Sequence, residues 1–129
     1  MIDPIFLDVE HVLLIHEDQL NAFGGINGIR DAGLLESAVM TPQVSFGGEY
    51  LHKDIFEMAA AYAFHIAENQ PFLDGNKRTA LSSAIVFLRL NGISVLDPNQ
   101  SLYKALIDIA NRVADKFDLA EIMKTLPTE

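Results

Sequence analysis

The sequence of 129 residues contains no cysteine and no tryptophan, and its apolar runs are short. Without cysteine, neither a disulfide framework nor a thiolate metal site can form. No stretch reaches the roughly 20 apolar residues that a membrane helix needs, and the segment Met1–Pro4 lacks the basic start of a secretory signal. We therefore expect a cytoplasmic protein that neither spans a membrane nor is exported.

Basic side chains are also scarce. Nine Lys and Arg residues against eighteen Asp and Glu residues give a net charge of −9 at pH 7. A molecule with this charge repels the phosphate backbone of nucleic acids and acidic lipid surfaces. We expect no nucleic-acid partner and no membrane partner, and the charge favours a basic partner protein.

Hydrophobic residues make up half of the chain, which is typical of a globular protein, and they recur at helical spacing. The stretches with this spacing are residues 8–22, the segment between Asp31 and Pro42, and residues 53–69, 76–91, 101–114 and 118–126. Residues 41–50 contain adjacent glycines and no helical period, so we expect a short flap loop or hairpin there. The sequence predicts an all-α fold, a single domain over residues 1–129 with about six helices.

Acidic residues stand where several of these helices begin. Asp31 is placed to cap the second helix. Asp118 with Glu121 three residues later predicts a capping box at the start of the last one.

The short segment between the third and fourth helices carries the candidate chemistry. A helix N-terminus offers unpaired N–H groups and the positive end of the helix dipole, so it is a natural receptor for phosphate. Lys77 and Arg78 add positive charge there, and Gly75 removes a side chain where a phosphate must approach. Cations at this end of a helix oppose the dipole, so a bound anion explains them better than capping does. Asp74 can hold a magnesium ion beside the same phosphates.

Residues 70–78, Gln-Pro-Phe-Leu-Asp-Gly-Asn-Lys-Arg, resemble the His-x-Phe-x-Asp-Gly/Ala-Asn-Lys/Gly-Arg loop of the Fic/Doc family. The resemblance extends to Gly24-Gly25, to residues 29–31 and 34–38, and to the continuation 79–81. It implies the helical Fic fold and a loop that binds a nucleotide. Asn76 would join Gly75, Lys77 and Arg78 in holding the phosphates.

The residue after the motif asparagine is Lys77, and lysine there resembles the death-on-curing (Doc) toxins rather than the AMP-transferring enzymes. The resemblance therefore implies transfer of phosphate from ATP, with Mg²⁺, to a hydroxyl of translation elongation factor Tu. Such a transfer would block translation. The family likeness also implies a partner antitoxin that restrains the toxin.

Gln70 occupies the motif position where the family has its catalytic histidine. An amide orients a hydroxyl but does not accept its proton, and a positioned base is worth about 10²–10⁴ in rate. We therefore expect weak or absent activity. Three alternatives stay open: a pseudoenzyme that binds nucleotide or antitoxin, an AMP-transferring enzyme, and a glutamine introduced to disable a toxin.

Other residues near the motif have simpler interpretations. His65, five residues before Gln70, points away from that position on a helix, and His52 reaches the loop only if the flap folds over it. His16 lies on the apolar side of the first helix, which favours a buried, hydrogen-bonded histidine. Phe72 and Leu73 are expected to pin the loop to the core. No histidine spacing indicates a zinc site.

Overall fold

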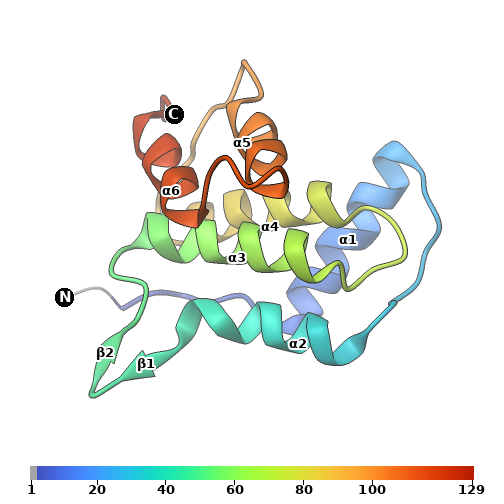
Figure 1. Cartoon of the computed structure of the whole chain (residues 1–129), viewed down its shortest axis with the longest axis horizontal. Helices are drawn as coiled ribbons and strands as arrows, with labels where there is room; N and C mark the ends of the chain where they lie inside the picture. The colour runs from blue at the N-terminus through green and yellow to red at the C-terminus, as the bar shows by residue number, and fades with distance from the viewer. Residues whose placement is uncertain (1–2) are drawn as a thin grey trace.

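The computed structural model describes residues 3–129 and contains six α-helices and one β-hairpin within that range (Figure 1). The elements are α1 (Val9–Phe23), α2 (Ala32–Met40), a 3₁₀ turn (Thr41–Gln43), β1 (Ser45–Phe46), β2 (Glu49–Tyr50), α3 (Ile55–Asn69), α4 (Asn76–Leu90), α5 (Ser101–Ala110) and α6 (Lys116–Thr125). The predicted all-α fold with a short flap is confirmed. None of the helices in residues 3–129 is long and apolar enough to cross a membrane.

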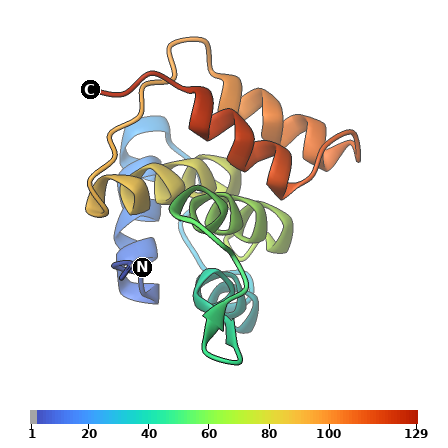
Figure 2. The same ribbon diagram turned by 90° about the vertical axis from the view of Figure 1, so that its left-hand side faces the viewer.

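The antiparallel pair α3 and α4 forms the centre of the molecule. Alanines 59–61 and 63 of α3 and Ala80 and Ala84 of α4 are fully buried, and small side chains let two helices approach closely. Tyr62 and Phe87 fill the space around them, with ring centroids 5.1 Å apart. Helices α5 and α6 lie on one side of this pair, and α2 and the hairpin lie on the other (Figures 1 and 2).

The hairpin and the loop that follows α3 lie at opposite ends of that helix (Figure 1). A helix of this length spans about 22 Å at a rise of 1.5 Å per residue. The hairpin pairs Ser45 with Tyr50 and Phe46 with Glu49, and Phe46 is 86% exposed. In this conformation the hairpin is therefore too far away to cover the loop.

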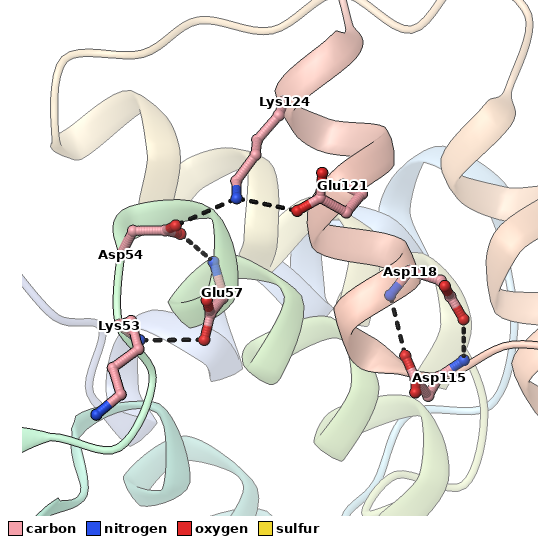
Figure 3. A network of polar contacts seen from close by, with 7 residues as sticks. All are labelled: Lys53, Asp54, Glu57, Asp115, Asp118, Glu121 and Lys124. Atoms are coloured by element: carbon pink, nitrogen blue, oxygen red, sulfur yellow. Dashed lines mark hydrogen bonds and ion pairs between the residues drawn. The ribbon is translucent and has the colours of Figure 1, made fainter.

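Aspartates cap four of the helices, and one predicted cap was misplaced. Asp31 accepts a hydrogen bond from the Leu34 N–H, which confirms the predicted start of α2. The N-cap of α6 lies three residues earlier than expected, because it is Asp115, and Asp118 is the third helical residue (Figure 3). The expected capping box of Asp118 with Glu121 was wrong.

Two polar clusters join α6 to α3. Lys124 lies between Asp54, the N-cap of α3, and Glu121, at 3.3 and 3.0 Å (Figure 3). The second cluster centres on Lys116, whose Nζ lies 3.0 Å from Nε2 of His52 and 3.3 Å from Nε2 of His65. Because an ammonium group only donates, both imidazoles accept through Nε2 and are neutral in this arrangement.

The Lys116 cluster predicts a loss of stability at mildly acidic pH. Burial, with Lys116 and His52 nearby, lowers the pKa of His65 from 6.5 to about 4, and burial also lowers the pKa of His52. The unfolded chain therefore takes up these protons first as the pH falls, and stability is lost between about pH 6.5 and 4. We expect His65 to contribute about 1–2 kcal/mol to this loss, allowing for its partial exposure.

Urea unfolding at pH 7.0 and 4.5 measures the effect, with His65→Gln as the matched variant. Glutamine keeps an acceptor for Lys116 but does not titrate, so its stability should fall less over this range. If both proteins lost the same free energy, His65 would not be the titrating group.

Candidate functional site

The candidate site is built on residues 70–75, which connect α3 to α4. Helix α3 ends at Asn69, and Gln70 follows in the left-handed conformation at φ 46° and ψ 57°. Helix α4 begins at Asn76 after Gly75, which is also left-handed at φ 80° and ψ 18°. Glycine adopts this conformation without the steric cost that a side chain brings. These two residues turn the chain so that the start of α4 faces an open cavity.

Four successive backbone N–H groups at the start of α4, those of residues 75–78, have no acceptor among the described residues. The first paired N–H belongs to Thr79, which donates to the Gly75 carbonyl at 2.9 Å. Gly75 is the N-cap and provides no side-chain acceptor. No capping side chain within residues 3–129 takes any of these N–H groups, so all four remain available for an external anion.

A cavity of about 410 Å³ lies over these N–H groups and brings the predicted residues together. Its polar lining consists of Gln70, Asp74, Asn76, Lys77, Arg78 and Tyr103. Two of these side chains are cationic at the N-terminus of a helix, where they oppose the helix dipole. The Arg78 guanidinium lies over the ring of Phe23 in a cation–π contact, 4.2 Å from the ring centroid.

Asp74 is the only acidic side chain that lines this cavity. Its Oδ2 accepts a hydrogen bond from the Ile26 N–H at 2.8 Å, while Oδ1 has no hydrogen-bond partner within residues 3–129. The same residues contain no cluster of three His, Asp or Glu side chains suited to a metal ion. One free carboxylate oxygen fits a magnesium ion that brings its remaining ligands from phosphates and water.

The Asn76 side chain closes the loop on itself. Its Oδ1 accepts from the Phe72 N–H at 2.9 Å, and its Nδ2 donates to the Phe72 carbonyl at 3.0 Å. This pair of bonds fixes the backbone around Phe72, which is 1% exposed. Phosphate binding was predicted for Asn76 from the sequence and stays a prediction. In the structure both polar atoms of its side chain bond to the Phe72 backbone, and its backbone N–H is free for an anion.

The segment from Gly25 to Asp31 clamps the outer side of the loop. The N–H groups of Arg30 and Asp31 both donate to the Pro71 carbonyl, and Leu73 N–H donates to the Gly28 carbonyl at 3.0 Å. A Cβ atom at Gly25 would lie 3.2 Å from Cβ of Asp74, so glycine permits this close approach. Leu73 is 52% exposed and packs over Gly28; only Phe72 of the expected apolar pair pins the loop to the core.

The Arg30 side chain holds the end of α3. It donates to the carbonyls of Gln70 at 2.6 Å and Asn69 at 2.7 Å. The last carbonyls of a helix have no partners within the helix, and a cation stabilises the negative end of the dipole. Arg30 thus fixes the backbone of Gln70 and leaves its exposed side chain directed at the cavity.

A second cavity of about 570 Å³ adjoins the first and shares Arg78 and Tyr103 with it. Leu81, Ile85 and Leu102 are among its apolar lining residues, and Asp97 and Gln100 also line it. The first cavity, with Asp74, Lys77 and Arg78, is charged, and the second cavity beside it is mainly apolar. This is the arrangement that a nucleotide needs for its phosphates and its base.

No histidine of the described residues lines the cavity beside Gln70. His65 and His52 are both bound to Lys116 of α6. His52 is 2% exposed and bonded to Lys116; the sequence had suggested a loop histidine that reaches the motif only if the flap folds over it. His16 is 3% exposed and hydrogen-bonded, as predicted, but its partner is the motif loop, which the sequence did not indicate.

The chain belongs to the Fic/DOC family, whose model matches residues 6–88. It is 38% identical over 88 residues to the "Protein kinase doc" of Escherichia phage P1, which covers 68% of this chain and 69% of that protein. It is 40% identical over 90 residues to the "Toxin Doc" of Mycolicibacterium smegmatis, covering 70% of this chain and 67% of the relative. The resemblance noted from the sequence is confirmed.

The left-handed conformation of Gln70 predicts that glycine at this position stabilises the fold. A non-glycine residue in this conformation costs about 1–2 kcal/mol, partly offset by the entropy that glycine loses on folding. We expect Gln70→Gly to raise the free energy of unfolding by up to about 1 kcal/mol in urea titrations. Glu68→Gly, in the exposed last turn of α3, is the control and should lower it by about 1 kcal/mol. A loss in both variants would mean that the Gln70 side chain itself stabilises the loop.

Proposed function

We propose that this protein is a Doc-like toxin that transfers the γ-phosphate of ATP to a protein hydroxyl, with translation elongation factor Tu as the target. The observation that carries the proposal is the row of four free N–H groups beside Lys77 and Arg78. Phosphate is the ligand that this combination of partial and full positive charge binds best. The relative named as a protein kinase supports transfer of phosphate over other uses of the site.

The site divides the nucleotide between its two cavities. The phosphates bind the N–H groups of residues 75–78 and the side chains of Lys77 and Arg78, and the nucleoside enters the apolar cavity beyond Arg78. Asp74 would hold Mg²⁺ through its free carboxylate oxygen, together with phosphate oxygens. When bound, the ion neutralises charge on the phosphates.

The reaction joins the target hydroxyl oxygen to the γ-phosphorus and breaks the bond between that phosphorus and the oxygen bridging to the β-phosphate. ADP leaves with the electrons of the broken bond. Gln70, in the base position, orients the hydroxyl without accepting its proton, so the proton passes to solvent water. Positioning and electrostatic stabilisation remain, because they depend on the loop and on Lys77 and Arg78. Transfer is therefore slow in this form of the protein.

A pseudoenzyme that binds nucleotide without transfer is the second candidate function. Gln70 favours this candidate. The free N–H groups, Lys77 and Arg78 all serve nucleotide binding, and an amide at position 70 lacks only the ability to accept a proton. Transfer of AMP is a third candidate, which Lys77 disfavours by its likeness to the death-on-curing branch.

The proposal includes a partner antitoxin in the same cytoplasm, in keeping with the relative named as a toxin. Large apolar side chains surround the loop and are exposed: Phe23 at 60%, Ile26 at 66%, Ile29 at 46% and Leu73 at 52%. Exposed apolar groups next to a functional cavity are typical of a protein interaction surface. An antitoxin that covers them would also block the cavity.

Intact-mass spectrometry of elongation factor Tu, incubated with this protein, Mg²⁺ and ATP, tests the proposed reaction. We expect a phosphate-sized mass gain that is about 10²–10⁴ times faster with Gln70→His. Asp74→Asn and Gln70→His/Asp74→Asn serve as controls for the site and should abolish the gain. An AMP-sized gain would establish the third candidate function, and no gain with Gln70→His would leave nucleotide binding as the function of the site or point to another target.

Calorimetric titration with ATP and Mg²⁺ tests nucleotide binding separately from transfer. Arg78→Ala should weaken binding by about tenfold or more, because it removes a charge-assisted hydrogen bond worth roughly 1.5–3 kcal/mol. Arg89→Ala is the matched control, since Arg89 lies exposed in the last turn of the same helix. Equal affinities for both variants would exclude phosphate binding at Arg78.

A further inference from the structure

His16 is a buried polar residue on a helix that contributes no residue to the motif. It lies one turn after Val12 on the apolar side of α1, and both residues are buried. Its imidazole stacks on the ring of Phe72, with centroids 3.8 Å apart and planes inclined by 7°. Its Nε2 lies 2.8 Å from the backbone carbonyl oxygen of Asp74. Because a carbonyl oxygen only accepts, Nε2 carries the proton and donates it.

The carbonyl that His16 binds belongs to the residue before Gly75, the N-cap of α4. In a continuous helix the Asp74 carbonyl would accept from the N–H of Arg78, four residues later. In the structure that bond is absent, and α4 makes its first bond one residue later, from Thr79 to Gly75. The Asp74 carbonyl therefore pairs with His16 and not with the Arg78 N–H.

The direction of this carbonyl also sets the direction of the next N–H group. In a trans peptide the C=O and N–H bonds point to opposite sides. With the Asp74 carbonyl turned toward His16 and the protein interior, the Gly75 N–H is turned the other way. Gly75 lines the cavity, so one hydrogen bond from α1 affects two donors of the phosphate site, the N–H groups of Gly75 and Arg78.

We propose that His16 is a positioning residue, whose Nε2–H bond to the Asp74 carbonyl keeps the N–H groups of Gly75 and Arg78 open for the phosphates of a nucleotide. That a nucleotide is the ligand rests on the proposed function. The effect of His16 on the loop backbone does not depend on the ligand. His16 does not touch the phosphates. Its contribution passes through the Asp74–Gly75 peptide.

Two substitutions separate the hydrogen bond from the stacking contact. His16→Gln keeps an N–H donor near the Nε2 position and loses the aromatic ring, whereas His16→Phe keeps a ring to stack on Phe72 and loses the donor. His11→Phe is the control, because His11 is exposed on the same helix and bonds only with Asp8.

Calorimetric titration with ATP and Mg²⁺ gives the first measurement. We expect His16→Phe to weaken binding by about tenfold or more, and His16→Gln to stay within about threefold of the parent, as His11→Phe does. Urea unfolding of each variant accompanies the titration. If His16 only stabilised the fold, the variants would lose affinity in proportion to their loss of stability. The presence or absence of an N–H donor at position 16 would then make no separate difference. Equal affinity of folded His16→Phe and the parent would overturn the proposal.

Backbone amide hydrogen exchange by NMR tests the structural part without a ligand. In the parent the Arg78 amide should exchange as a free group, and in His16→Phe it should become protected by about tenfold or more as it pairs with the released Asp74 carbonyl. Unchanged exchange at Arg78 would overturn the positioning role. If the parent bound neither ATP nor inorganic phosphate, the proposed function would fail, and the exchange result would still decide what His16 does to the loop.

Discussion

The start of α4 carries a row of four N–H groups that are left without acceptors among the described residues. A helix end of this kind is unfavourable unless water or a ligand satisfies it, and here two cationic side chains raise the cost further. The arrangement persists because the loop before it has little freedom. The Asn76 side chain bonds to the Phe72 backbone, and the N–H groups of Arg30 and Asp31 bond to the Pro71 carbonyl. The Asp74 carboxylate accepts from the Ile26 N–H.

The central helices provide the rigidity that this loop needs. Helices α3 and α4 are packed closely through alanines, so the ends that the loop joins have nearly fixed positions. Contacts from α1 and from residues 25–31 then fix the remaining freedom, since His16 supports the loop from within and Gly25 approaches Asp74 from outside. A site built this way binds an anion without first paying for the ordering of a flexible loop. That preorganisation is independent of which group is transferred.

The sequence was sufficient to locate the helices of residues 3–129 and the motif residues of the cavity, because both follow from neighbours along the chain. Tyr103, which reaches the cavity from α5, was missed because it is distant from the motif in the sequence. Apolar spacing located all six helices, and the motif residues meet because they are contiguous. The boundaries of α5 and α6 were less accurate. Asp115 and Asp118 are both good N-caps followed by an acidic residue three positions on, and tertiary contacts of Lys116 with His52 and His65 accompany the earlier start.

Contacts between distant segments were not predictable from local patterns. The bonds of Arg30 to the end of α3, of Ile26 to Asp74 and of His16 to the loop join residues that lie about forty to sixty positions apart and depend on how α1 crosses α4. The contact of His16 could have been suspected from the sequence. A histidine on an otherwise apolar helix face must find a hydrogen-bond partner when it is buried, and the nearest unsatisfied carbonyls in a helical protein are those at helix ends and in loops.

The backbone conformation of Gln70 and the free N–H groups of residues 75–78 depend on different contacts. Its left-handed backbone follows from its place after α3 and from the Arg30 bond to its carbonyl, and neither depends on the side chain. Histidine and asparagine occupy this conformation more readily than most residues, so a histidine would enter the same backbone with little rearrangement. The free N–H groups lie five or more residues further along and are held by other contacts. Position 70 and the anion-binding N–H groups are therefore held by separate contacts in this structure, and the physical requirements for holding phosphate do not depend on which side chain stands at position 70.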